Sequence, residues 1–325
     1  MIRKPFGIWS ELSFIVILLI SCVSSPVPTA KPAPKSGWPD HFEVVEIPSS
    51  LDANMQRAYF YKTSSKVQMP LIVSLHTWSG DYAQPDELAL ISMENDWNYI
   101  HPDFRGPNLT KDACLSTKVI SDIDDAIDFA TISGNVDKRN VFIIGVSGGG
   151  YATIGSFMKS RIYIRGFLAW APITDLVAWY YESISRGNGF DKDILKCTSE
   201  GNSFDVNEAQ KRSPLYWQTP QTSKSFIEIY AGIHDGYTGS VPISHSLFFF
   251  NKLVTDSGNR SEIITEKEII ALLTQNVKRD SVYGKIGDRD VLLRKRSGNV
   301  LLTIFDGGYE ILPDFVFKRI KNLVE

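Results

Sequence analysis

The stretch that most constrains the fold is the decapeptide 141–150, VFIIGVSGGG, in which an apolar run leads into a glycine-rich turn around one serine. The run is rich in β-branched and aromatic residues and indicates a buried strand, and the segment after it is compatible with a helix. Gly145-x-Ser147-x-Gly149 is the pattern that presents a serine hydroxyl at a sharp strand-to-helix turn, where only small neighbours fit. An ordinary glycine-rich turn is the alternative, but this context favours Ser147 as a nucleophile.

Apolar and amphipathic segments alternate along most of the chain. Strands are expected at 42–47, 56–62, 69–75, 97–101, 140–146, 164–171, 225–231 and 299–305, and helices at 85–95, 116–133, 148–159, 241–254 and 313–324. This alternation predicts an α/β fold whose mostly parallel sheet has right-handed crossovers and helices on its faces, with an antiparallel pair at its start. The segment from about 173 to 220 interrupts the pattern with aromatic helical pieces, and we expect a small helical cap there.

The first 22 residues read as a leader. Arg3 and Lys4 precede an apolar run at 12–20 that is too short to span a bilayer, as in a secretory signal. The run ends in LISC at Cys22, which resembles the lipobox of bacterial lipoproteins, whose cysteine is lipidated after cleavage. Residues 23–41 then form a proline- and serine-rich tether, and the domain spans 42–325. We expect export and a lipid anchor at Cys22, on the periplasmic or cell-surface side of a bacterial membrane; a plain signal peptide is the alternative.

The composition limits which partners and cofactors this chain is expected to bind. A net charge of −3 provides no basic surface for nucleic acid, so no nucleic-acid partner is expected. No cysteine or cysteine–histidine spacing suggests a metal site, and no nucleotide-binding pattern stands out, so no cofactor is expected. If Cys22 is lipidated, Cys114 and Cys197 remain in an oxidising compartment. A disulfide between these two and two separate buried thiols are both compatible with the sequence, and the oligomeric state stays open.

Two further loops follow buried strands and carry candidate site residues. Serine nucleophiles of this type need two backbone N–H groups facing the developing oxyanion, one from the residue after the serine and one from an earlier strand-end loop. The sequence LHTWSG at 75–80 is such a loop, so Gly148 and Trp78 are the predicted donors. Asp235 follows the strand 225–231, which fits the chain order serine, acid, base. Strand-end packing for Trp78 and a turn role for Asp235 are the alternatives.

Five motifs occur together and in order: HxxxG at 76–80, HPDFRGPN at 101–108, GVSGGG at 145–150, GIHDG with SVPISHS at 232–246, and GGYE at 307–310. The set resembles the prolyl oligopeptidase-type catalytic domain of the α/β-hydrolase superfamily, in the secreted single-domain form found in bacteria, over about residues 42–323. The resemblance implies an eight-stranded α/β-hydrolase sheet, Ser147 as nucleophile and Asp235 as the acid. It also implies a histidine base after the last strand.

Tyr309 stands where the resemblance implies that histidine. A phenol with a pKa near 10 is a poor proton acceptor at pH 7, unlike an imidazole with a pKa near 6.5. A repurposed non-catalytic protein, a base recruited from elsewhere such as His234, and a variant at one codon are all compatible with this change. His245 falls within a predicted helix, where a structural role is expected.

The sequence therefore predicts a serine hydrolase that cleaves peptide or ester bonds through an acyl-enzyme on Ser147, with activity impaired by Tyr309. A non-catalytic surface lipoprotein that binds a ligand in the inherited pocket is the alternative from another class. Because no propeller domain precedes the hydrolase segment, ester substrates such as acylated glycans stay open as well, and an esterase acting on them is a further alternative.

Overall fold

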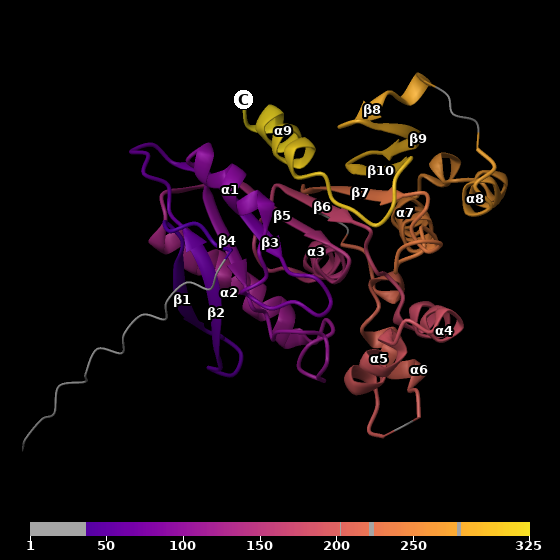
Figure 1. The fold of residues 1–325 in the computed structure, drawn as a ribbon, viewed down its shortest axis with the longest axis horizontal. Helices are drawn as coiled ribbons and strands as arrows, with labels where there is room; N and C mark the ends of the chain where they lie inside the picture. Colours follow the sequence, from indigo (N-terminus) through magenta and orange to yellow (C-terminus); the bar gives the residue numbers. More distant parts are fainter. Residues whose placement is uncertain (1–36, 202, 221–223, 278–280) are drawn as a thin grey trace, which may run out of the picture. The chain divides into compact units, whose positions relative to one another are not determined.

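Ten strands form one sheet in the computed structural model of the chain, which describes residues 37–201, 203–220, 224–277 and 281–325 (Figure 1). In chain order the strands are β1 (Glu43–Pro48), β2 (Met55–Tyr61), β3 (Met69–Leu75), β4 (Asn98–Pro102), β5 (Val136–Val146), β6 (Gly166–Trp170), β7 (Phe226–Gly232), β8 (Lys285–Ile286), β9 (Arg289–Ser297) and β10 (Val300–Phe305). Their order across the sheet is β1-β2-β4-β3-β5-β6-β7-β10-β9-β8.

The middle of the sheet is parallel and both edges are antiparallel. The six strands from β4 to β10 in the sheet order pair in parallel. At one edge β1 and β2 join through antiparallel pairing, as the sequence predicts, and at the other edge β9 and β8 do so. The carboxyl ends of β3, β5, β6, β7 and β10 therefore meet at one rim, where the loops that follow them can converge.

The described part of the chain also contains nine α-helices. They are α1 (Glu87–Glu94), α2 (Thr117–Ser133), α3 (Gly148–Lys159), α4 (Leu176–Arg186), α5 (Phe190–Thr198), α6 (Val206–Lys211), α7 (Ser244–Asp256), α8 (Glu266–Leu273) and α9 (Pro313–Val324). Short 3₁₀ turns occur at Pro214–Tyr216, Arg260–Glu262 and Ser281–Tyr283. Helix starts follow local chemistry: the Asp86 carboxylate accepts from the N–H of Leu88, and Pro313 opens α9.

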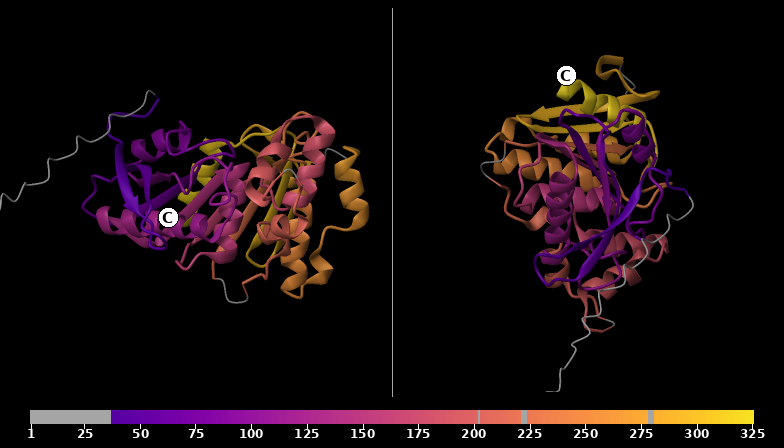
Figure 2. Two further views of the ribbon diagram at one scale, coloured as in Figure 1. Left: turned by 90° about the horizontal axis from the view of Figure 1, so that it is seen from below. Right: turned by 90° about the vertical axis from the view of Figure 1, so that its left-hand side faces the viewer.

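Two apolar layers hold the helices to the sheet. Val141 and Ile143 of β5 face a core cluster that includes α2, α3 and α7, whereas Phe142 and Ile144 face one that includes α1 and α9. This alternation follows from the strand period of two, and it explains why β5 is apolar on both faces. Figures 1 and 2 show α1 and α9 on the side of the sheet opposite to α3.

Three further helices pack against the cluster that includes α2, α3 and α7. The helices α4, α5 and α6 all fall within the predicted insertion 173–220 and group together in both figures. Residues 33–325 form a single compact unit that includes them. That this group acts as a cap stays a prediction.

Two expectations need correction. The implied eight strands are joined by the edge hairpin β8–β9, which brings the sheet to ten strands within the described residues. The sequence predicts no helix or strand between 254 and 299, yet this interval also contains α8, which starts with a capping box between Thr265 and Glu268. The signal peptide 1–22, most of the tether 23–41 and the lipidation site Cys22 lie outside the described residues. Within the described part of the chain, no helix has the length and apolar character needed to cross a bilayer.

Candidate active site

Ser147 lies at a backbone turn that its glycine neighbours make possible. It has φ 59° and ψ −118°, caps α3, and donates its N–H to the carbonyl of Trp170 at 2.9 Å. A Cβ at Gly145 would lie 2.3 Å from the backbone of Gly149, and one at Gly149 would lie 2.1 Å from the carbonyl oxygen of Leu75. Only glycine fits at either position, so the strained serine is held by close backbone packing on both sides.

The phenol of Tyr309 lies beside the Ser147 side chain. Burial and the nearby Asp235 carboxylate raise the pKa of the phenol above its ordinary value of 10, and the nearby Ser147 hydroxyl offsets part of this rise. Ser147 is 3% exposed and Tyr309 38% exposed, so the nucleophile is buried while the tyrosine reaches the surface. The phenol therefore stays protonated at neutral pH and is poorly suited to take the proton of the serine.

Asp235 lies at the carboxyl end of β7 and is almost fully buried, with 1% of its surface exposed. Its Oδ1 accepts the N–H of Gly236 at 2.9 Å and of Val241 at 3.0 Å, whereas its buried Oδ2 has no hydrogen-bond partner. Burial raises the pKa of this carboxyl from 3.8 to about 6, against the opposing effect of the two N–H bonds. A carboxylate with one unused, buried oxygen is suited to receive an N–H donor such as an imidazole.

Glycines bring the loops after β7 and β10 into contact. A Cβ at Gly239 would lie 2.2 Å from Oδ1 of Asp235 and 2.6 Å from Cβ of Tyr309, so both residues pack against this glycine. A Cβ at Gly232 would lie 2.2 Å from the carbonyl oxygen of Gly308. The close approach explains why residue 232 is glycine, and it places the acid beside Tyr309.

The predicted oxyanion donors also meet. A Cβ at Gly148 would lie 2.3 Å from the backbone nitrogen of Trp78, so the two peptide groups are in contact. As the first residue of α3, Gly148 has no intrahelical acceptor for its N–H. The indole of Trp78 is buried and packs edge-on against Trp179 at 4.7 Å. The side chain of Trp78 thus has a packing role, which was the alternative to an oxyanion role. In addition, its backbone N–H lies beside Ser147.

Asn108 is a neighbour of this loop that sequence reasoning missed. Its backbone N–H donates to the carbonyl of Trp78 at 2.8 Å, and its side-chain oxygen accepts the N–H of Cys114 at 2.8 Å. Its place in the FRGPN motif was the available signal, but only the fold shows which carbonyl it holds. Asn108 therefore fixes the peptide that follows the predicted oxyanion donor.

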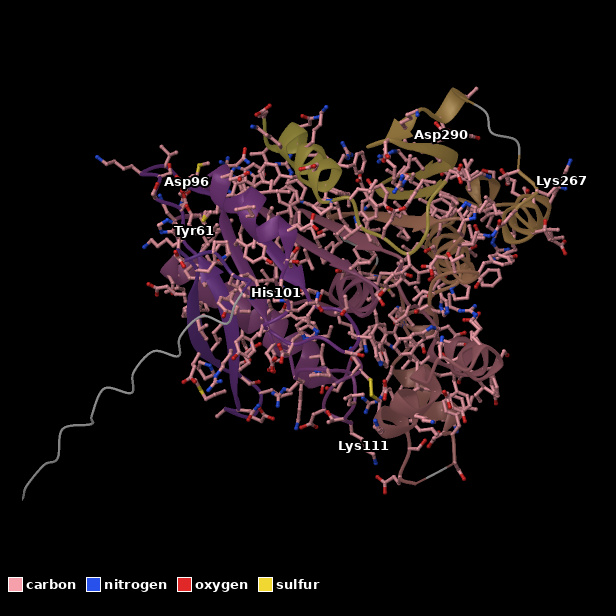
Figure 3. The ribbon with its side chains drawn as sticks, in the orientation of Figure 1. Tyr61, Asp96, His101, Lys111, Lys267 and Asp290 are labelled. Carbon is pink, nitrogen blue, oxygen red and sulfur yellow. A yellow bond between two sulfur atoms is a disulfide. The ribbon has the colours of Figure 1, made fainter. Side chains whose placement is uncertain are left out.

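Cys114 and Cys197 form a disulfide, which resolves the two options that the sequence left open. The bond links the loop of Asn108 to α5 and is drawn in yellow beside Lys111 (Figure 3). Sγ of Cys197 lies 3.3 Å from the carbonyl oxygen of Asn108. Arg212 reinforces the same junction through bonds to the carbonyls of Lys111 at 2.9 Å and Ala113 at 3.0 Å.

None of the five histidines of the chain forms a hydrogen bond with Ser147 or Asp235 in the described structure. His234 pairs through Nε2 with Asp306 at 2.9 Å. His245 faces the N–H of Thr174 at 3.3 Å and Glu182 at 3.1 Å, in keeping with a structural role.

The other three histidines are engaged or distant. Both ring nitrogens of His76 lie 2.9 Å from backbone carbonyl oxygens, and His41 precedes the edge strand β1. Burial lowers the pKa of His101 to about 4, and this side chain lies on β4, two strands from β5 (Figure 3). No group of three or more metal-binding side chains is found among the described residues.

The strand order, the elbow at Ser147 and the acid at the end of β7 define an α/β-hydrolase fold with a serine site at its rim. The family model described as the prolyl oligopeptidase family matches residues 104–268, which is half of the chain. The chain belongs to the prolyl oligopeptidase family, whose members are serine peptidases, as the sequence motifs predict. No match is found among curated proteins.

Solved structures of peptidases share the fold. An acylaminoacyl peptidase from Pyrococcus horikoshii has a TM-score of 0.59 and 17% identity, over 87% of this chain and 41% of that one. A puromycin-hydrolyzing peptidase from Mycobacterium tuberculosis has a TM-score of 0.57 and 12% identity, over 89% and 39%. Prolyl oligopeptidase B from Galerina marginata has a TM-score of 0.54 and 15% identity, over 68% and 32%. The chain spans about two fifths or less of the length of these structures.

Proposed function

We propose that this chain is a serine hydrolase that forms an acyl-enzyme on Ser147, and that its turnover is limited by Tyr309. In this reaction the Ser147 oxygen attacks a carbonyl carbon, the negative charge on the carbonyl oxygen is received by the N–H groups of Gly148 and Trp78, and the leaving group departs. Water then releases the acyl group. The observation that carries the proposal is the convergence of Ser147, both N–H groups and a buried acid at one rim.

Proton transfer is the weak step. The hydroxyl proton of Ser147 needs an acceptor, and the phenol beside it is protonated at neutral pH. Loss of the histidine in a well-studied serine protease lowers turnover by about 10⁶-fold, which leaves only binding and oxyanion stabilisation. We therefore propose slow acyl transfer with activated esters and little or none with amides.

A second candidate is a protein that binds an acyl ligand without turning it over. The observation that favours it is that no imidazole among the described residues is hydrogen-bonded to Ser147 or Asp235. In that case the pocket retains ligand affinity, and Tyr309 closes the nucleophile off from solvent. Both candidates share the pocket and differ only in whether Ser147 becomes acylated.

A fluorophosphonate probe separates the two. The probe labels a serine that is activated and reachable, and an intact-mass measurement shows the adduct directly. We expect labelling of the wild type at a slow but measurable rate and none of Ser147→Ala. Hydrolysis of a short-chain nitrophenyl ester gives the second readout. Equal rates for the wild type and Ser147→Ala, with no adduct, would overturn the hydrolase and leave the binding protein.

For the substrate, we propose only the type of bond that is cleaved. Peptide and ester bonds both pass through the tetrahedral intermediate that the two N–H groups would stabilise. Esters have the better leaving group and tolerate a weak general base more readily, so we favour an ester, with acylated glycans as one source.

We also propose export and lipid anchoring at Cys22. The support is the sequence alone: a charged start, a short apolar run and the LISC tetrapeptide, followed by a proline-rich tether. The disulfide between Cys114 and Cys197 is in keeping with an oxidising compartment.

A further inference from the structure

One face of α4 connects the two sides of the candidate active site. Trp179 packs against the indole of Trp78 at 4.7 Å and donates its Nε1–H to the carbonyl of Ser240 at 2.9 Å. Arg186, seven residues further along the same helix, donates to the same carbonyl at 3.2 Å. The spacing of seven places both side chains on one face of the helix. This helix therefore runs from the oxyanion side to the loop that follows the acid.

The carbonyl of Ser240 lies next to the reacting groups. Gly239, directly before it, packs against both Asp235 and Tyr309. Tyr309 in turn lies beside the Ser147 side chain. Contacts thus run from Arg186 through the 239–240 segment to the nucleophile, and the guanidinium lies at the rim of the same site.

The charge of Arg186 is not neutralised by a salt bridge. Among the described residues no carboxylate forms an ion pair with it, and its hydrogen bond uses the backbone carbonyl of Ser240. Burial raises the pKa of Glu182, but the bond from His245 and the charges of His245 and Arg186 lower it overall. Arg186 is also among the groups that offset the burial of Asp235. The guanidinium is therefore close to the site, exposed to solvent, and has N–H donors left for a ligand.

We propose that Arg186 binds a carboxylate of the substrate, so that the substrate class is an ester or amide that carries an anionic group near the scissile bond. A guanidinium presents paired N–H donors that match a carboxylate, and such charge-assisted bonds are about twice as strong as neutral ones. This proposal rests on the proposed function, because the carboxylate and the scissile carbonyl have to occupy one pocket.

Boronic acids test it without turnover. They add reversibly to a serine oxygen and imitate the tetrahedral intermediate, so their affinity reports on the site even where Tyr309 blocks catalysis. The probes are 3-carboxyphenylboronic acid and its neutral, similarly shaped amide, 3-carbamoylphenylboronic acid. The corresponding 4-substituted pair varies the distance between the boron atom and the carboxylate or amide. Affinities are measured by calorimetry with the full soluble chain.

We expect the carboxylate of one pair to bind about tenfold tighter than the amide, and the preference to fall with ionic strength. Arg186→Gln should reduce the preference to less than about twofold, and Arg186→Lys should restore part of it. Arg139→Gln is the matched control, because it removes one positive charge in the amino-terminal half of β5, away from Ser147, and should leave the preference unchanged. A preference that is absent in the wild type, or that survives Arg186→Gln, overturns the proposal.

Failure of the proposed function is recognised separately. If Ser147→Ala binds the boronates as well as the wild type does, the serine adduct does not form and the hydrolase is wrong. Arg186 is then tested in that variant by NMR titration with phenylacetate against phenylacetamide, and equal affinities overturn the carboxylate site. Two displacement assays then identify the source of the carboxylate. Stronger displacement of the boronate by glucuronate than by glucose indicates a sugar acid, and stronger displacement by acetyl-dialanine than by its amide indicates a peptide terminus.

Discussion

Asp235 and Tyr309 both pack against Gly239, yet Oδ2 of the acid has no hydrogen-bond partner while the phenol lies beside Ser147. The tyrosine therefore occupies the position of the expected base without using the group that would orient that base. An imidazole in its place has a buried carboxylate oxygen ready to accept its N–H. Under the proposed function, Tyr309 is therefore the one side chain that separates this site from a complete triad.

Replacement of Tyr309 by histidine should therefore raise hydrolysis. The imidazole can accept the Ser147 proton while its other nitrogen donates to Asp235, so we expect at least about a hundredfold increase in kcat/KM for a nitrophenyl ester. The assay compares the wild type, Tyr309→His, and Tyr309→His with Ser147→Ala, which should return to background.

Two results would contradict this reading. High wild-type activity that depends on Ser147 would mean that another group accepts the proton, although His234 is already bonded to Asp306. A folded Tyr309→His that gains nothing would favour the binding protein, because the site would then differ from a hydrolase by more than its base.

The raised pKa of Asp235 predicts a pH dependence of stability. Between about pH 4 and pH 6 the folded state holds a proton on this carboxyl that the unfolded state, with a pKa near 3.8, has released. The free energy of unfolding therefore falls as pH rises through this window, by at most on the order of 3 kcal/mol from this group. Asp235→Asn cannot titrate, so relative to the wild type it should gain stability from pH 4 to pH 7.5. Urea unfolding at the two pH values measures the free energies of unfolding. A difference between the variant and the wild type that is the same at both pH values would show that burial does not shift the pKa of this carboxyl.

Gly148→Ala tests the oxyanion site. The added methyl would lie 2.3 Å from the nitrogen of Trp78 and has to displace the N–H that we assign to the oxyanion. In the Tyr309→His background we expect kcat to fall by about 10²–10³-fold, with a smaller effect on KM. Gly201→Ala is the matched control, because a Cβ there meets nothing within 4 Å. An active Gly148→Ala would place the oxyanion elsewhere.

The sequence predicts the turn at Ser147 better than the edges of the fold. The turn is visible in the sequence as Gly145-x-Ser147-x-Gly149. The backbone contacts at the two flanking positions allow only glycine, so the local sequence alone indicates the turn. The strand run 69–75 and the helix 148–159 coincide with β3 and α3, because long apolar or amphipathic segments carry a strong period.

What sequence reasoning missed depends on tertiary contacts. The strand β9 carries charged residues along its exposed edge, so its apolar period is weak, and it was not assigned. Asn108 is one polar residue in a loop until the fold brings it to the carbonyl of Trp78. Likewise, the charge of Arg186, which has no salt bridge, indicates a binding role only once the fold shows α4 beside the loop at Ser240.

Membrane association should depend on Cys22. Acyl chains contribute about 0.8 kcal/mol per buried CH₂ group, and two or more chains give stable anchoring. Expression in a bacterium followed by fractionation should therefore find the wild type with membranes and Cys22→Ser in the soluble fraction. Equal membrane retention of the two forms would show that the cysteine is incidental.

Reduction of the disulfide should weaken both the fold and the site. Cys114 and Cys197 are 83 residues apart in the sequence, so the bond removes much loop entropy from the unfolded chain, and its loss should cost about 2–5 kcal/mol. The same bond lies against Asn108, which holds the carbonyl of Trp78. We therefore expect the Cys114→Ser, Cys197→Ser variant to unfold at lower denaturant and to bind boronic acids more weakly even where it is fully folded. Wild type treated with reductant should match that variant, whereas the variant should not respond to reductant. Unchanged boronate affinity in the folded variant would mean that Asn108 is held without the disulfide, by Arg212 and the helices around it.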